Sequence, residues 1–214
     1  MRRTRHLLTL ALLFTVACDD TKDDDHSDHE DHSDGQTTSL VLNLTPVNGD
    51  ETLSFSWSDP EGDGDPVVDD ILLPDGSDHS HHDTQRYTLD IELWNEQEDP
   101  VEDVALEIAE LATEYQFFFT GSAVEGPATG NNDDAIIEHE YADSDDDGLP
   151  LGLSNNIKTL AWGAGELTVT LRHLPPEGDE PVKTDDLVDA VASDGFSAIG
   201  GDDDIQVTFN IEVE

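Results

Sequence analysis

The sequence predicts an all-β fold, an antiparallel β-sandwich of the immunoglobulin-like kind, with about seven strands and one docked helix. Three observations lead to this prediction. From residue 39 onward, short segments alternate between apolar and polar side chains, which is the pattern of strands buried on one face. Gly, Pro, Asn and Asp separate these segments, as they do in turns. Leu, Ile, Val and Phe make up about a quarter of the chain, enough for a folded core despite the high charge.

Alternation places the individual strands. The last segment shows it most clearly, because Val207, Phe209 and Ile211 share one face of a strand while Gln206 and Thr208 share the other. Segments of this kind lie at 39–45, 52–58, 86–94, 114–120, 135–141, 166–173 and 204–213.

One helix is predicted among the strands, over residues 100–113. Asp99 stands at the N-cap position, Pro100 opens the first turn, and Glu102 is the capping-box acid. A weaker helical turn is expected over 184–191. The long helix carries one apolar stripe that we expect to pack on the sandwich, formed by Val101, Val104, Ala105, Ile108, Leu111 and Ala112.

The N-terminus has the features of a secretory signal. Basic residues are followed by an apolar stretch of about ten residues, too short to span a bilayer, and then by Cys18, the only cysteine. This resembles a bacterial lipoprotein signal, in which the cysteine becomes the lipidated first residue. A plain secretory signal with an incidental cysteine is the alternative. We therefore expect a signal peptide at 1–17, an acidic, His-rich tether without a fold at 18–38, and the sandwich domain at 39–214.

The net charge of −44, from 52 Asp and Glu against 8 Lys and Arg, limits the function. Binding of nucleic acid is excluded, because phosphate contacts require clustered Lys and Arg, and no cluster of these residues follows the first five positions. Cations are the expected partners. Part of the acidity fits a high-salt habitat, where screening removes the self-repulsion.

Histidines give the sharpest functional signal. Six of the nine lie in two short acidic segments. Imidazole binds zinc, copper and nickel, and neighbouring carboxylates concentrate dications. We predict metal binding, with zinc as the favoured metal, whereas a solvated acidic linker that happens to contain His is the alternative. The proposed ligands are His26, His29 and His32 in the tether, and His79, His81, His82 and Asp83 in a loop between strands.

Two Asp-rich turns have the spacing of the first half of a calcium loop, with acids at positions one, three and five and then a glycine. In the first, the bidentate acid at position twelve is absent, because Ser154 stands there. Weak calcium binding and simple polar turns are both left open. The acids concerned are Asp143, Asp145 and Asp147 in one turn, and Asp59, Glu61 and Asp63 in the other.

No catalytic set emerges, and we predict that the chain is not an enzyme. It lacks a nucleophile elbow, a His-Glu-x-x-His zinc motif and a Gly-rich phosphate loop with lysine. His139 and His173 fall on the core-facing side of their strands. We expect them to be ordinary hydrogen-bonded histidines near strand ends, and a paired set of ligands at the edge of the core is the alternative.

The order of turn and strand signatures resembles a family. The motifs are DPEGDG at 59–64, LWNEQEDPVED at 93–103, YQFFF at 115–119, DSDDDGLPLGL at 143–153, LTVTLRH at 167–173 and DIQVTF at 204–209. Together they are similar to small bacterial lipoproteins, common in Bacteroidota, that are often labelled type 1 periplasmic-binding-fold proteins. The resemblance spans most of residues 40–213 and implies a lipoprotein of the cell surface or periplasm. The strand alternation disagrees with the label, because a periplasmic-binding fold needs repeated βα units.

Three functions are consistent with these observations. The first is a lipoprotein of the bacterial cell envelope, held on the membrane by an acyl anchor, that binds zinc or another divalent metal and passes it to an outer-membrane transporter. The second is a structural or adhesive surface lipoprotein whose Asp loops bind calcium. The third is an accessory lipoprotein that binds a soluble partner and no ion.

Overall fold

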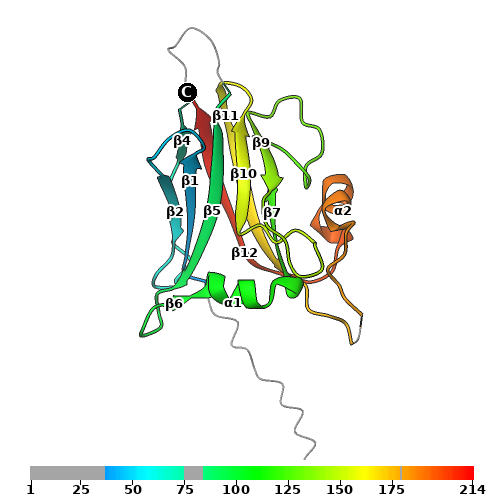
Figure 1. Cartoon of the computed structure of the whole chain (residues 1–214). Helices are drawn as coiled ribbons and strands as arrows, with labels where there is room; N and C mark the ends of the chain where they lie inside the picture. Colours follow the sequence, from blue (N-terminus) through cyan, green and yellow to red (C-terminus); the bar gives the residue numbers. More distant parts are fainter. Residues whose placement is uncertain (1–36, 75–83, 179) are drawn as a thin grey trace, which may run out of the picture. The chain divides into compact units, whose positions relative to one another are not determined.

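The computed structural model describes residues 37–74, 84–178 and 180–214, and it shows a β-sandwich with a docked helix (Figure 1). The predicted fold class is therefore confirmed. Cys18 and the histidines of both acidic segments lie outside the described residues. Within the described ranges, no helix is long and apolar enough to cross a membrane.

The larger sheet of the sandwich has the strand order β3-β2-β1-β5-β10-β9-β8, and β6 pairs with β5 at one end. Its central pairs are antiparallel, whereas the short edge strand β8 runs parallel to β9. The strands are β1 (Ser39–Pro46), β2 (Leu53–Ser58), β3 (Val67–Val68), β5 (Arg86–Asn95), β6 (Glu102–Asp103), β8 (Val124–Glu125), β9 (Ile137–Tyr141) and β10 (Ser154–Thr159).

The smaller sheet has the order β4-β12-β11-β7. Antiparallel pairing of the two longest strands forms its centre, and the short strand β4 adds to β12 in parallel. These strands are β4 (Ile71–Leu73), β7 (Tyr115–Thr120), β11 (Gly163–His173) and β12 (Asp202–Val213).

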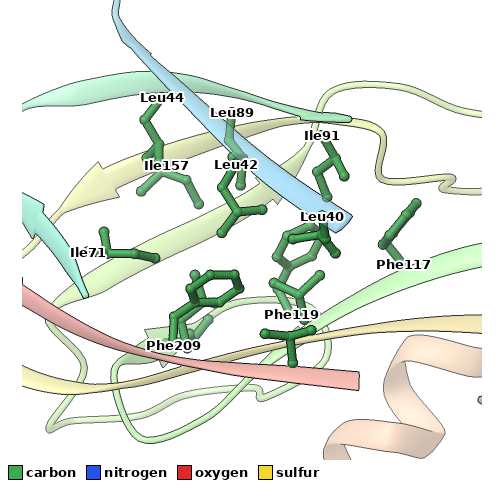
Figure 2. Packing of buried hydrophobic residues seen from close by; sticks show 14 of the residues in the cluster. Leu40, Leu42, Leu44, Ile71, Leu89, Ile91, Phe117, Phe119, Ile157 and Phe209 are labelled. Atoms are coloured by element: carbon green, nitrogen blue, oxygen red, sulfur yellow. The ribbon is translucent and has the colours of Figure 1, made fainter. Parts of the chain in front are cut away.

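The core lies between the two sheets. Leu40, Leu42 and Leu44 point inward from β1, and Phe119 and Phe209 face them from the smaller sheet (Figure 2). All five side chains are at most 3% exposed, because every second residue of each strand faces the partner sheet.

The strands predicted from alternation all occur, as β1, β2, β5, β7, β9, β11 and β12. The sequence interpretation missed the short strands β3, β4, β6 and β8, and it also missed the longer strand β10. Its inward positions include Asn155 and Thr159, which are fully buried polar residues, with Ile157 between them. Because the inward side of β10 is mostly polar, apolar alternation could not reveal this strand.

The predicted start of the helix was wrong. Helix α1 spans Val104–Glu110, followed by the 3-10 turn η1 (Ala112–Glu114), rather than 100–113. Glu102 and Asp103 instead form β6, which pairs with the end of β5. Tertiary strand pairing therefore overrides the local capping signal. Val104 and Ile108 are buried, as the apolar stripe predicted, and α1 lies across one end of the sandwich (Figure 1).

The second helix is α2 (Leu187–Asp194), with the 3-10 turn η2 (Phe196–Ala198) after it. The helical turn expected over 184–191 overlaps it. Leu187 and Val191 pack against Phe118, which projects from the outer side of β7. This helix therefore covers part of the outer face of the smaller sheet.

The central packing gives a first prediction. Phe209→Ala removes a fully buried ring between the sheets and is expected to lower the free energy of unfolding by about 3–5 kcal/mol. Thr208→Ala, next to it but facing outward, is the matched control and should cost less than about 1 kcal/mol. Chemical denaturation at fixed salt measures both. An equal loss of unfolding free energy in both variants would contradict the orientation of β12, with Phe209 facing the core and Thr208 facing solvent.

Candidate functional site: the Asp loops and the buried ion pair

The structure fixes both flanks of the second His-rich segment, although His79, His81, His82 and Asp83 themselves lie outside the described residues. On one side, the hydroxyl of Tyr87 donates a hydrogen bond to the carbonyl of Pro74 at 2.8 Å. On the other side, the N–H of Gln85 donates to Oγ1 of Thr159 at 2.9 Å. The segment therefore leaves and rejoins the fold at the start of β5.

The domain begins at the opposite end of β5. Thr38, just before β1, donates its N–H to the carbonyl of Trp94 at 2.9 Å. His26, His29 and His32 precede this point in the sequence and lie outside the described residues.

The loop between β9 and β10 contains the first Asp-rich turn. Asp143 uses both carboxylate oxygens on its own loop, accepting hydrogen bonds from the N–H groups of Gly152 at 2.7 Å and Ser154 at 2.9 Å. Gly152 has a φ of +94°, and a Cβ there would lie 2.8 Å from the Cβ of Phe117. Asp143 therefore holds a loop that only glycine can complete.

Asp145 lies at the centre of the same loop in a buried ion pair. Its Oδ1 accepts the N–H groups of Asp147 at 3.0 Å and Leu149 at 2.8 Å. Its Oδ2 lies 2.8 Å from Nζ of Lys183, and both side chains are 1% exposed. Nζ of Lys183 also donates to the carbonyl of Ala112 at 2.8 Å. The pair therefore joins three segments of the chain.

Charge stabilisation at Asp145 outweighs the cost of burying it. Desolvation alone would raise the pKa of this carboxyl, but the hydrogen bond from Lys183 and those from the backbone of Leu149 and Asp147 lower the pKa below its ordinary value. The carboxylate is therefore ionised in the folded protein at neutral pH. A cation already neutralises it, and that cation is the ammonium group of Lys183.

A pocket of about 240 Å³ lies beside this ion pair. Asp147, Glu114 and Lys183 line it together with apolar side chains such as Leu149 and Leu174. Asp147 is exposed, so the three acids of the calcium-like spacing have different environments. Asp143 stabilises the loop, Asp145 is paired with Lys183, and only Asp147 faces solvent.

In the second Asp-rich turn, as in the first, the carboxylate of the first acid accepts hydrogen bonds from the backbone of its own turn. Asp59 accepts hydrogen bonds from the N–H groups of Asp63 at 3.2 Å and Gly64 at 2.9 Å. Asp63 in turn accepts from the N–H of Asp65 at 3.2 Å. Glu61 is exposed. In this structure Asp59 and Asp63 thus shape a turn between β2 and β3.

No group of three or more His, Cys, Asp or Glu side chains within residues 37–74, 84–178 and 180–214 is arranged to hold a metal ion. The spacing of acids in the two turns does not by itself bring their oxygens together around one point. The two histidine segments lie outside these ranges.

His139 is buried in the core edge, as expected from its strand position. Its Nε2 lies 3.0 Å from Oδ1 of Asn155, whose amide donates to the carbonyl of Gly152 at 2.7 Å. The imidazole also stacks on Phe119 with a centroid distance of 4.1 Å. Burial lowers the pKa of His139 to about 4, and the hydrogen bond with Asn155 opposes this only in part.

His173 is less deeply placed. It stacks on Tyr115 with a centroid distance of 4.6 Å, and its Nε2 lies 3.8 Å from a carboxylate oxygen of Glu114. Both described histidines therefore have packing partners within the fold. The expected hydrogen bond is present for His139, which lies in the middle of β9, whereas His173, the last residue of β11, is held by stacking and by the nearby carboxylate.

Sequence reasoning missed Lys183 and Tyr141. The hydroxyl of Tyr141, on β9, donates to the carbonyl of Phe117, on β7, at 2.7 Å and so links the two sheets. Lys183 is one of only three lysines in the chain, and this scarcity was the available signal. Its partner is 38 positions away in the sequence, so no local pattern connects Lys183 with Asp145.

Comparison with known proteins adds no relative. No family model, curated protein or solved structure matches this chain.

The buried pair gives a second prediction. Lys183→Met leaves the carboxylate of Asp145 buried without a cation, so the free energy of unfolding should fall by about 3–5 kcal/mol. The control is Lys158→Met, which breaks the half-exposed pair with Glu138 and should cost about 1 kcal/mol or less. Urea denaturation at neutral pH compares them. A cost for Lys183→Met as small as that of the control would show that the pair is not essential.

The buried imidazole gives a third prediction. The pKa of His139 is lowered from 6.5 to about 4, so the unfolded chain takes up a proton first as the pH falls, and stability is lost from about pH 6.5 downward. Between pH 7 and pH 5 this loss amounts to about 2 kcal/mol. His139→Gln should remove it, whereas His173→Gln should keep it. The measurement is the free energy of unfolding of each variant at both pH values, and identical pH dependence in His139→Gln and the parent would contradict it.

Proposed function

We propose that this chain is a membrane-anchored extracytoplasmic lipoprotein that binds a divalent transition metal, with zinc as the favoured ion, through its two acidic histidine segments. The proposed ligands are those named above, in the segments at 26–32 and 79–83. Delivery of the ion to a transporter of the outer membrane is part of the same proposal, as is the acyl anchor at Cys18.

One observation carries this proposal, the distribution of the histidines. After residue 18 the chain has eight, of which six lie in the two segments. The other two, His139 and His173, have partners in the fold. Packing therefore accounts for the isolated histidines but not for the clustered ones. Imidazole groups among carboxylates are a favourable ligand set for zinc.

The fold supports the second segment as a binding loop. Its flanks are tied to β5 and β10 through Tyr87 and Gln85, so four ligand side chains belong to one short connection between fixed points. Fixed flanks reduce the chain entropy lost when a loop closes around a metal. The net charge of −44 also raises the local concentration of dications.

The alternative is a structural or adhesive surface lipoprotein with calcium bound at the Asp loops. Calcium at the loop of residues 143–147 would have to compete with the backbone N–H groups held by Asp143 and with Lys183 for Asp145. These contacts favour the histidine segments over the Asp loops as the place where metal binds.

Titration calorimetry of the purified protein with zinc tests the proposal and gives the fourth prediction. Changing His79, His81 and His82 together to Ala is expected to weaken zinc binding by about tenfold or more, and changing His26, His29 and His32 should remove a separate contribution. Neutral histidines carry no charge, so these changes leave the field of the acids intact.

The matched control neutralises exposed acids instead. Glu61→Gln with Asp63→Asn removes two charges from a turn without a histidine and should change zinc binding less than about twofold. Zinc binding through imidazole should persist at high salt, whereas simple attraction to acids should not. The proposal would be overturned if the zinc affinity stayed the same after both sets of three histidines were changed to Ala, or if zinc binding disappeared at high salt.

A further inference from the structure

A hollow of about 390 Å³ lies on the outer face of the larger sheet, near the start of β5. Strand register places Arg86, Lys158 and Glu138 side by side on β5, β10 and β9. In the next outward row, Asn156 stands opposite Glu140. Directly paired residues share one face of a sheet, so all five side chains surround the same hollow.

The charges of this hollow are arranged in a simple way. Nζ of Lys158 lies 2.6 Å from a carboxylate oxygen of Glu138, so these two groups neutralise each other. Arg86 lies on β5 next to Lys158, and Glu140 lies on β9 two residues from Glu138. Both side chains are exposed. Neither forms an ion pair with any residue that the structure describes. Among the residues that the structure describes, the hollow thus has one cation and one anion without an ion-pair partner.

The spacing of these two groups suits a small ligand. β5 and β9 lie on either side of β10, which separates them by about 10 Å, and Glu140 lies two residues, about 7 Å, along β9 from the row that contains Arg86. Arg86 and Glu140 carry long side chains that can shorten this span from both sides. The amide of Asn156 lies on the strand between them, and exposed Val47, whose N–H donates to the carbonyl of Arg86 at 2.8 Å, provides an apolar margin. The volume falls in the range of sites for small molecules, about 300–1,000 Å³.

We propose that this hollow binds a small zwitterion, an organic molecule with one carboxylate and one ammonium group. The guanidinium of Arg86 holds the carboxylate through two parallel hydrogen bonds, and the carboxylate of Glu140 holds the ammonium. The net charge of the chain selects the same class of ligand. A protein of charge −44 repels a plain anion, whereas a zwitterion approaches without net repulsion. This proposal does not depend on zinc binding by the histidine segments.

Three ligands of similar length provide the test, which is the fifth prediction. γ-Aminobutyrate carries both charges, butyrate carries only the carboxylate, and butylamine carries only the ammonium. Titration of the purified protein, followed by NMR, is expected to show γ-aminobutyrate binding at least about tenfold more tightly than either of the others. Arg86→Gln and Glu140→Gln should each weaken that binding by about tenfold.

The matched control is Glu92→Gln, which removes an exposed acid from the same outer face of β5 but outside the hollow, and should change binding less than about twofold. Because Arg86 and Glu140 both face outward, their variants are expected to keep the thermal stability of the parent, and a melting curve of each confirms this. Equal affinity for butyrate and γ-aminobutyrate would overturn the proposal in favour of a plain anion site. Absence of saturable binding, or binding unchanged in Arg86→Gln, would also overturn it.

Discussion

Strict alternation along the strands is the constraint on which the rest of the structure depends. A chain with 52 acids can bring two sheets together only if the carboxylates stay in water, because an unpaired buried charge costs several kcal/mol. On β5, the inward residues Leu89 and Ile91 are buried, whereas Asp90 and Glu92 between them are exposed. A shift of one residue in register would exchange the two sets. The acids therefore fix the register of the sheets as firmly as the apolar residues do.

Because cations are scarce, their positions are informative. Within the part of the chain that the structure describes, Lys158, Arg172 and Lys183 each pair with an acid, namely Glu138, Asp203 and Asp145. Lys183 is the one that is fully buried, and it connects the loop after β9 with the turn after α1 and the segment before α2. An Asp-rich loop in this protein is thus built around an internal ammonium group.

Elements that depend on interactions between neighbouring residues in the sequence could be predicted from it, whereas elements that depend on pairing between distant segments could not. Seven strands were predicted correctly because their alternation is local and their inward residues are mostly apolar. β10 was missed because Asn155, which faces inward, is polar and is satisfied by His139 from the neighbouring strand. The start of α1 was misplaced because pairing of β6 with β5 decides it.

The ion pair shows the same limit at the candidate site. The spacing of Asp143, Asp145 and Asp147 suggested either a calcium loop or a polar turn, and it gave no indication of the partner of the central acid, Lys183. Lys183 reaches Asp145 only because the two sheets and the segment before α2 come together in the folded chain. A spacing motif describes one side of a site, and the group that completes the site comes from elsewhere in the fold.

The many acids of this chain have two explanations, adaptation to high salt and specific pairing with cations, and the effect of salt distinguishes them. A habitat of high salt explains exposed acids that lack partners, since screening at molar ionic strength removes their mutual repulsion. It does not explain acids that are matched one to one with a scarce cation. Asp145 with Lys183 and Glu138 with Lys158 are matched in this way, and their contacts of 2.8 and 2.6 Å persist where long-range fields are screened. High salt therefore leaves three features of this protein unexplained. They are the buried pair of Asp145 with Lys183, the hollow beside Arg86, and the histidines of the two acidic segments.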